Sequence, residues 1–141
     1  MIVGICGSRK IKLSVAEIQE IVVESGFSVD AIIDCKEPNG IDASGRAWAN
    51  ALGIPCIKEF PPEWDNFDLP RVITKINTFG KLYNSYAGIY RNHCAADYLK
   101  ENDGGLILIW RADSKGSKDM LTYSKSIGIR VFEKILGGEY I

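Results

Sequence analysis

The stretch "GGLILIW" (residues 104–110) decides the fold of this chain, because it is the clearest buried strand in the sequence. A short, continuous apolar run beside a glycine pair is typical of a strand that is covered on both faces. The residue pattern predicts a helix over residues 86–101 before it, and a loop followed by a helix over residues 114–128 after it. A strand between two helices favours a layered α/β arrangement.

The same alternation runs through the rest of the chain. A capping box at Ser14–Glu17 predicts the start of a helix that ends at Gly26. Further strands are predicted over residues 2–6, 28–34, 54–60 and 129–135, and a further helix over residues 40–53. We therefore expect an α/β fold, a Rossmann-like open parallel sheet of about five strands with helices on both faces.

Residues 65–82 interrupt this alternation. The segment "LPRVITKINTF" (69–79) is compatible with a short helix or with a mobile excursion. A chain of 141 residues is the size of one domain. We expect a single domain over residues 1–141, in which residues 65–82 form a candidate lid or interface segment.

Charge and hydropathy exclude several classes of protein. The chain has 17 basic and 18 acidic residues and a net charge of −1. A dedicated nucleic-acid binder depends on many Lys and Arg contacts to phosphates, so we expect no nucleic-acid partner. The apolar runs are too short for a signal peptide or for a membrane helix of ~20 residues. We expect a soluble, cytoplasmic protein without a membrane partner.

The four cysteines carry no ligand pattern. Cys6, Cys35, Cys56 and Cys94 are far apart, and no CxxC or Cys/His spacing occurs. The first three fall in or beside predicted strands, where a free cysteine behaves as a small core residue. We expect reduced, structural thiols, and neither a metal nor a cofactor.

The loops that follow the predicted strands are the candidate ligand-binding segments, because ligands of open parallel sheets bind at the carboxyl ends of the strands. These loops are "GSRK" (7–10), "CKEPNGID" (35–42), "PPEW" (61–64) and "RADSKGS" (111–117). In the last loop, Gly116 and Ser117 begin a helix between Lys115 and Lys118. Unpaired backbone N–H groups and the positive end of the helix dipole make such a helix start attractive to an anion.

Each of these residues also has a plain structural interpretation. Gly7 suits a turn after a strand, and Asp42 suits a helix N-cap. His93, the only histidine, suits a surface or packing position on its helix. Trp64 follows two prolines and is available to line a pocket and to stack on a base. Neither GxGxxG nor a Walker motif is present, which disfavours a dinucleotide site of the usual type and ATP hydrolysis.

The order of these short motifs resembles the SLOG superfamily, in particular its YspA-like branch. The matching segments, in chain order, are "GSR", "GIDASGRAWA", "PPEW", "AGIYRN" and "GSKDM". The resemblance extends over residues 2–135, and the AGxxRN element is its most specific part. It implies a Rossmann-like fold that gathers GSR, RN and the G-[TS] helix start around the phosphate and ribose of a nucleotide.

The motifs and the loops together define the expected ligand-binding residues. Arg91 would offer a bidentate fork and Asn92 an amide to the ligand, while Gly88 would keep the helix start open. The full set is Gly7, Ser8, Arg9, Gly40, Asp42, Trp64, Gly88, Arg91, Asn92, Lys115, Gly116 and Ser117.

The resemblance also raises the question of catalysis. LOG-type phosphoribohydrolases of this superfamily carry PGGxGTxxE, whose Glu supports cleavage of an N-glycosidic bond. Here Met120 takes the position of that Glu. Asp119 points about 100° away around the helix. Asp42, Asp113 and Glu63 are alternative carboxylates in neighbouring loops. The catalytic residues therefore stay unassigned.

Three functions remain open at this point. The first is binding of a nucleotide or nucleotide-derived ligand by a sensor or sequestering protein, which the missing Glu favours. The alternative is an N-glycosidic hydrolase that acts on a nucleoside monophosphate or a related nucleotide. A DNA-processing role like that of the DprA branch is disfavoured by the net charge.

Relatives in the superfamily dimerise, so we expect a homodimer or a higher homo-oligomer. Four tyrosines suit either its interface or helix-to-sheet contacts: Tyr83, Tyr86, Tyr90 and Tyr98.

Overall fold

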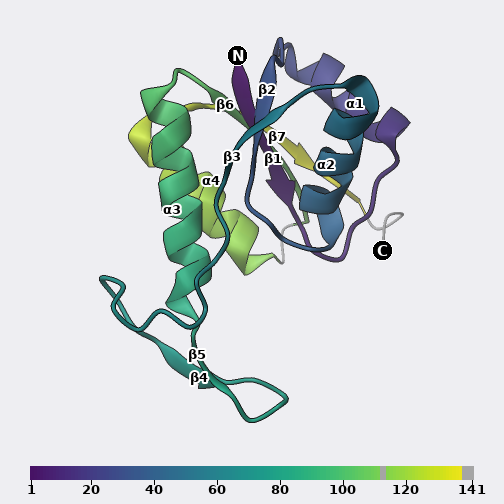
Figure 1. Ribbon diagram of the computed structural model, residues 1–141. Coiled ribbons are helices and arrows are strands. Elements are labelled where there is room, and N and C mark those ends of the chain that lie inside the picture. Colours follow the sequence, from purple (N-terminus) through teal and green to yellow (C-terminus); the bar gives the residue numbers. More distant parts are fainter. Residues whose placement is uncertain (112–113, 138–141) are drawn as a thin grey trace.

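The structure is a computed structural model that describes residues 1–111 and 114–137. Its main sheet has five parallel strands in the order β3-β2-β1-β6-β7 (Figure 1). The strands are β1 (Ile2–Gly7), β2 (Ala31–Asp34), β3 (Cys56–Glu59), β6 (Gly105–Trp110) and β7 (Arg130–Ile135). The helices are α1 (Val15–Ser25), α2 (Gly40–Leu52), α3 (Tyr86–Glu101) and α4 (Lys115–Ile127). The predicted Rossmann-like α/β fold is confirmed.

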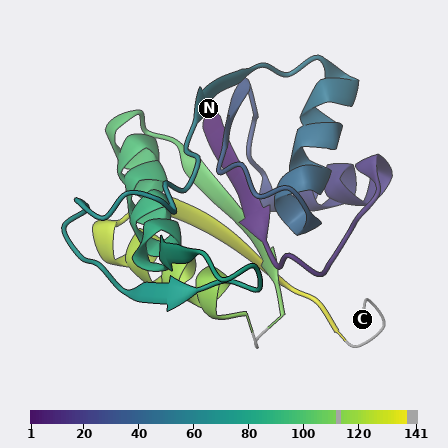
Figure 2. The ribbon, with the colours of Figure 1, turned by 60° about the horizontal axis from the view of Figure 1, so that its bottom comes forward.

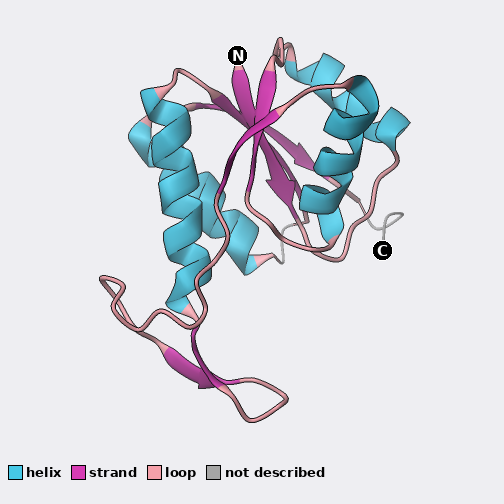
Figure 3. Ribbon diagram, viewed as in Figure 1, coloured by secondary structure: helices cyan, strands magenta, loops and turns pink. Residues whose placement is uncertain are grey.

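The helices cover both faces of this sheet (Figure 3). Every residue of β6 is buried, so its side chains contribute alternately to two cores. Ile107 and Ile109 pack with the buried faces of α1 and α2. Leu106 and Leu108 pack with small and apolar side chains of α3 and α4. The apolar run of 104–110 is explained by its position in the middle of the sheet, where neither face meets water.

The helix ends follow the local signals in the sequence. The Ser14 hydroxyl accepts a hydrogen bond from the Glu17 amide at 3.1 Å, and the Glu17 carboxylate accepts one from the Ser14 amide at 3.0 Å. This is the predicted capping box. Gly26 and Gly53 end α1 and α2 in the left-handed conformation, as is usual for a C-cap glycine.

The strand order reverses between β1 and β6. The chain builds outward from β1 through β2 to β3 and then crosses back to place β6 on the other side of β1. The loops after β1 and β6 therefore leave the sheet in opposite directions. Such a switch point opens a crevice at the carboxyl ends of the two strands.

Cys56, on the edge strand β3, is exposed and not buried as the sequence predicted. All four residues of β3 are exposed, including Cys56, so the prediction that Cys56 is a core residue is wrong. The reason is that β3 pairs with β2 alone and forms one edge of the sheet. Cys6 and Cys35 lie on the central strands or directly after them and are buried, as predicted.

Residues 61–85 form an extension from the sheet, here called the arm (Figures 1 and 2). It contains an antiparallel pair of strands, β4 (Thr74–Ile76) and β5 (Leu82–Asn84). The short helix considered for residues 69–79 is therefore absent. Three consecutive β-branched residues, 72–74, favour an extended chain. The Asn77 side chain then closes the turn by accepting hydrogen bonds from the amides of Phe79 and Lys81.

In the part of the chain that the structure describes, no helix combines the length and apolar character needed to cross a membrane.

Candidate functional site

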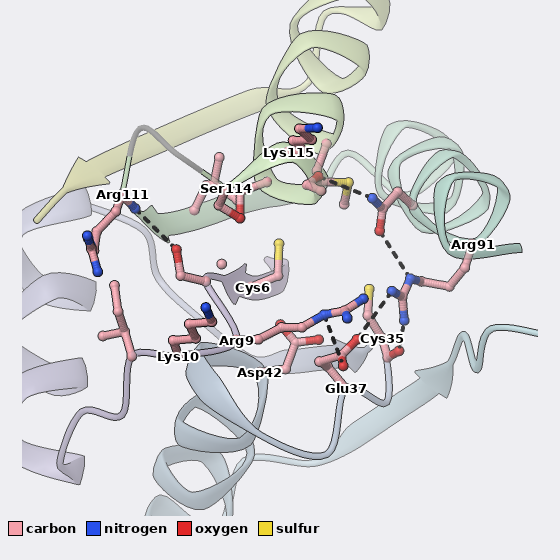
Figure 4. A pocket seen from close by; sticks show the side chains of 18 residues that line it. Cys6, Arg9, Lys10, Cys35, Glu37, Asp42, Arg91, Arg111, Ser114 and Lys115 are labelled. Carbon is pink, nitrogen blue, oxygen red and sulfur yellow. Dashed lines mark hydrogen bonds and ion pairs between the residues drawn. The ribbon is translucent and has the colours of Figure 1, made fainter. Parts of the chain in front are cut away.

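A cavity of about 390 Å³ opens at the carboxyl ends of β1 and β6, where the strand order reverses (Figure 4). Its size is within the range of small-molecule sites. The loops after β1, β2 and β6 contribute to its wall, together with the first turns of α2 and α4 and the second turn of α3. Its lining residues are Cys6–Ile11, Cys35, Glu37, Asp42, Arg91, Asn92, Leu108, Arg111, Ser114–Ser117 and Met120.

The cavity brings together most of the residues expected from the sequence. Nine of the twelve line it: Gly7, Ser8, Arg9, Asp42, Arg91, Asn92, Lys115, Gly116 and Ser117. They come from segments up to 110 residues apart in the chain (117 minus 7). Gly40, Trp64 and Gly88 do not line it.

Gly40 and Gly7 have structural roles at this edge of the sheet. A Cβ on Gly7 would lie 1.7 Å from the carbonyl oxygen of Ile109 on the neighbouring strand. Gly40 has a φ of +76°, and its Cβ would lie 2.4 Å from the carbonyl oxygen of Ser8. Both glycines let two loops approach each other closely. Gly7 lines the cavity. Gly40 does not line it, but packs against Ser8 and Arg9, which do.

Trp64 and Gly88 pack against each other beside the arm. A Cβ on Gly88 would lie 3.1 Å from Cη2 of Trp64. The indole also makes an edge-to-face contact with Tyr83, with ring centroids 5.9 Å apart. Trp64 lines a different hollow of about 330 Å³ on the arm. Its placement therefore does not match the expected base-stacking role in the main cavity, because the arm carries it away from the sheet.

One end of the cavity is suited to an anion. At the start of α4 the Ser114 hydroxyl donates to the Ser117 hydroxyl at 2.9 Å and does not cap the helix. The amides of the first turn therefore keep their hydrogen-bonding capacity for a ligand. A Cβ on Gly116 would meet no atom within 4 Å, so the backbone there is open.

Three cations line the same cavity as this helix start. Lys10, Arg111 and Lys115 all line the cavity (Figure 4). Within residues 1–111 and 114–137, neither Lys10 nor Lys115 has an ion-pair partner. Lys10 and Arg111 lie in loops that the sequence analysis selected, but only the folded structure directs them to the same space. The cavity therefore combines a helix N-terminus with positively charged side chains, and both favour a phosphate.

Arg91 is bound to the protein on several sides. Its guanidinium donates through Nε to Oδ1 of Asn92 at 3.0 Å and through Nη1 to the carbonyl oxygen of Cys35. Its Nη2 lies 3.6 Å from Oε2 of Glu37, whose other oxygen is 3.2 Å from Nε of Arg9. Arg91 is only 8% exposed. It lines the cavity, and its donors hold the loop after β2 against α3.

Glu37 was not among the residues predicted from the sequence. It lies in the "CKEPNGID" loop, which the carboxyl-end rule had selected, but nothing in that loop distinguishes it locally from Glu59 or Glu63. Its role depends on Arg9 and Arg91, which are distant from it in the sequence.

Asn92 connects two helices. Its side-chain amide donates to the Gly116 carbonyl oxygen at 3.4 Å and so joins α3 to α4.

Asp42 is the unusual charge in the cavity. It is the third residue of α2, whose N-cap is Asn39, so the interpretation of Asp42 as the N-cap is wrong. The residue is 7% exposed, and its carboxyl group has no hydrogen-bond partner among the described residues. Burial raises its pKa from 3.8 to about 7, although the positive charge of Arg91 opposes the shift.

The two thiols beside Asp42 are neutral. Burial raises the pKa of Cys35 to about 12 and that of Cys6 well above its ordinary value. A thiol reacts as its thiolate, so these cysteines are inert wall residues. No group of His, Cys, Asp or Glu within the described ranges is arranged to hold a metal ion.

The other candidate carboxylates lie elsewhere. Asp119 contacts Nε2 of His93 at 3.3 Å, and the His93 ring stacks on Tyr123 with centroids 3.8 Å apart. His93 is thus engaged in helix-to-helix contacts. Glu63 accepts a hydrogen bond from Asn66 on the arm. Asp113 lies outside the described residues.

Met120, which the expected resemblance aligns with the Glu of LOG-type enzymes, gives the wall an apolar surface. Its side chain is 2% exposed and belongs to the core between α3, α4 and the sheet. Of the carboxylates considered for catalysis in the described part of the chain, Asp42 is the one in the cavity wall.

Comparisons of this chain with protein-family models, with curated proteins and with solved structures found no match.

Proposed function

We propose that this cavity binds a nucleotide or nucleotide-derived ligand and that the start of α4 receives its phosphate. The observation that carries this proposal is the uncapped first turn of α4 in one cavity with Lys10 and Lys115. A helix N-terminus and cations at the switch point of a parallel sheet are the usual combination for phosphate binding. The remaining volume suits a sugar and a base.

Membership of the SLOG superfamily, in its YspA-like branch, is part of this proposal. The "GSR", "RN" and "GS" motifs all contribute lining residues to the same cavity, as members of that superfamily would require. The "GID" segment supplies Asp42. The "PPEW" segment is the exception, since its tryptophan packs on the arm.

Binding without turnover is the function that this wall supports best. The apolar Met120 offers no group to activate water or to stabilise a positively charged sugar. A sensor or a sequestering protein needs only to bind the nucleotide.

One observation favours N-glycosidic hydrolysis as a second candidate function. Asp42, with a pKa near 7, is able to exchange a proton at neutral pH.

A thermal-unfolding scan against mononucleotides, dinucleotides, ADP-ribose and cyclic nucleotides tests this proposal. A ligand at about a hundred times its Kd adds roughly 2.7 kcal/mol to the free energy of unfolding, which raises Tm by several degrees. Lys10→Ala and Lys115→Ala should each weaken the binding about tenfold and leave the ligand-free Tm nearly unchanged, because both side chains are exposed.

Lys118→Ala is the matched control. It removes the same charge from the same helix at an exposed position that does not line the cavity. If no nucleotide shifts Tm, or if the three lysine variants behave alike, the phosphate site is contradicted. Arg91→Ala is a poor probe, since loss of its contacts to Cys35 and Glu37 would change the fold as well as the site. Chromatography of the same samples would reveal a cleaved ligand and so separate hydrolase from binder.

We also propose that the chain forms a homodimer through the arm, in the cytoplasm. The arm exposes Ile76, Phe79 and Leu82, a concentration of apolar side chains that favours contact with another protein surface. The four cysteines are all unpaired, which suits a reducing compartment.

A further inference from the structure

Asp42 is a largely buried residue in the cavity wall whose carboxyl group has no hydrogen-bond partner in the described part of the chain. The residue is 93% buried (100 minus 7), lines the cavity, and accepts no hydrogen bond within the described ranges. A buried polar group without a partner costs stability, and native proteins rarely keep one without a use. The neighbouring Asp34 is equally buried, but Arg46 donates to it at 2.9 Å. The contrast indicates that the partner of Asp42 is supplied by the ligand.

The chemistry of the cavity limits what that partner is. A second phosphate at Asp42 is disfavoured, because the carboxylate repels it whenever Asp42 is ionised. An ammonium or other cationic group would have to share the cavity with Lys10, Arg111 and Lys115. A neutral hydrogen-bonding group remains. Four charged groups act on Asp42, two of them negative and two positive: Asp34 at the end of β2, Glu37 in the loop after β2, Arg46 on α2 and Arg91 on α3.

Among neutral groups, a hydroxyl fits best. Burial raises the pKa of Asp42 to about 7, so protonated and ionised forms coexist near neutral pH. A hydroxyl donates to the ionised form and accepts from the protonated form, so it can pair with either. An N–H group can only donate, so it would leave the acid proton of the protonated form without an acceptor. The sugar of a nucleotide carries such hydroxyls directly beside its phosphate.

We propose that Asp42 is a specificity-determining residue that binds a ribose hydroxyl of the ligand and thereby selects ribonucleotides over deoxyribonucleotides. This inference rests on the nucleotide-binding function proposed above. It assigns the two ends of the cavity to two parts of one ligand. The phosphate lies at the start of α4, and the sugar hydroxyl lies at the first turn of α2.

Isothermal titration calorimetry tests the assignment. The probes are the four common ribonucleoside 5′-monophosphates and their 2′-deoxy and 3′-deoxy counterparts. For the nucleotide that binds the native chain, at least one deoxy form should bind ten or more times more weakly, because the buried carboxyl would lose its only partner. In Asp42→Leu, which is close in shape and has no polar atoms, the ribo and deoxy forms should bind within threefold of each other.

The ratio of affinities distinguishes recognition from a merely structural role. If Asp42 only shaped the cavity, its replacement would weaken all three sugar forms by the same factor and keep the ratio. Equal affinities in the native chain, or an unchanged ratio in Asp42→Leu, would overturn the inference while leaving nucleotide binding intact. Failure of every nucleotide to bind the native chain would contradict the proposed function itself, and this inference with it.

Asp42→Asn is a second variant, which tests the inference even if Asp42→Leu fails to fold. The amide has the shape of the carboxyl group and can still donate to or accept from a hydroxyl. It should therefore keep part of the preference for the ribo form, at an intermediate ratio. If the ribo and deoxy forms bound Asp42→Asn within threefold of each other, as expected for Asp42→Leu, the preference would not depend on a hydrogen bond at residue 42. That result would also overturn the assignment.

Discussion

Arg91 and Asp42 are both buried ionisable residues in the cavity wall, but only Arg91 has hydrogen-bond and ion-pair partners in the part of the chain that the structure describes. Arg91 has partners on Asn92, Cys35 and Glu37, whereas the carboxyl group of Asp42 has no hydrogen-bond donor among the described residues. The paired charge contributes to the architecture. The unpaired one lowers stability, and a residue retained in spite of that cost is a good candidate for a functional role.

Asp42 should make the stability of the protein depend on pH. Its pKa is 3.8 in an ordinary environment and about 7 in the folded chain, so the folded state holds its proton more tightly. The free energy of unfolding therefore falls as pH rises between those two values. Asp42→Asn removes this effect. It should be more stable than the native chain at pH 8 by on the order of 4 kcal/mol, at about 1.4 kcal/mol per tenfold shift.

Urea unfolding at pH 4 and at pH 8 measures this difference. The advantage of Asp42→Asn should shrink to less than about 1 kcal/mol at pH 4, where Asp42 is protonated in the folded chain and only partly ionised in the unfolded chain. Asp68→Asn removes a carboxylate that is exposed on the arm, and it should change the free energy by less than about 0.5 kcal/mol at both values. An advantage of equal size at pH 4 and pH 8 would show that Asp42 does not titrate as described.

At the scale of elements, the arm depends on a single buried side chain. Asn84 is fully buried, and its Oδ1 accepts hydrogen bonds from the amides of Ile73 and Tyr86. Its Nδ2 donates to the carbonyl oxygens of Asn66 and Arg71. One amide group thus joins the loop after β3, the approach to β4 and the start of α3, in a segment that has little core of its own.

Asn84→Ala should therefore loosen the arm. It leaves four backbone groups without their partner, and we expect a loss of about 3 kcal/mol, since an unsatisfied buried group costs about 1–3 kcal/mol and water will reach some of these. Trypsin should cleave at Arg71, Lys75 or Lys81 at least tenfold faster than in the native chain. Asn50→Ala, at an exposed position on α2, is the control and should leave the rate unchanged. Equal cleavage of both variants would show that Asn84 does not organise the arm.

At the scale of the whole molecule, the arm is the part without a hydrophobic partner. Phe79 at its turn is 93% exposed, and Ile76 and Leu82 beside it are more than half exposed. The residues that line the cavity, by contrast, all lie outside the arm. Self-association and ligand binding should therefore respond to different substitutions.

Sedimentation velocity on Phe79→Asp tests the proposed dimer. The native chain should sediment as a dimer and the variant as a monomer, because a charge at a buried aromatic contact opposes association. Val23→Asp places the same charge at another exposed apolar position, on α1, and should stay dimeric. A monomeric native chain, or a dimer that withstands Phe79→Asp, would exclude the arm as the interface.

The alternation of strands and helices could be predicted from the sequence because its signals are local. The apolar run of 104–110, the capping box at Ser14 and the glycines after α1 and α2 each act within a few residues. The rule that ligands bind at the carboxyl ends of parallel strands selected four loops, and three of them line the cavity. For this reason most of the expected site residues do line one cavity.

Only the tertiary structure decided what each of those residues contacts. The connection of Arg91 to Glu37, the isolation of Asp42, the exposure of Cys56 and the removal of Trp64 to the arm all depend on segments distant in the sequence. Burial and charge environment are properties of the assembled layers, since they arise when separate elements exclude water together. Local pattern determines which elements form and which loops can meet. The three-dimensional arrangement determines which of their side chains remain available to a ligand.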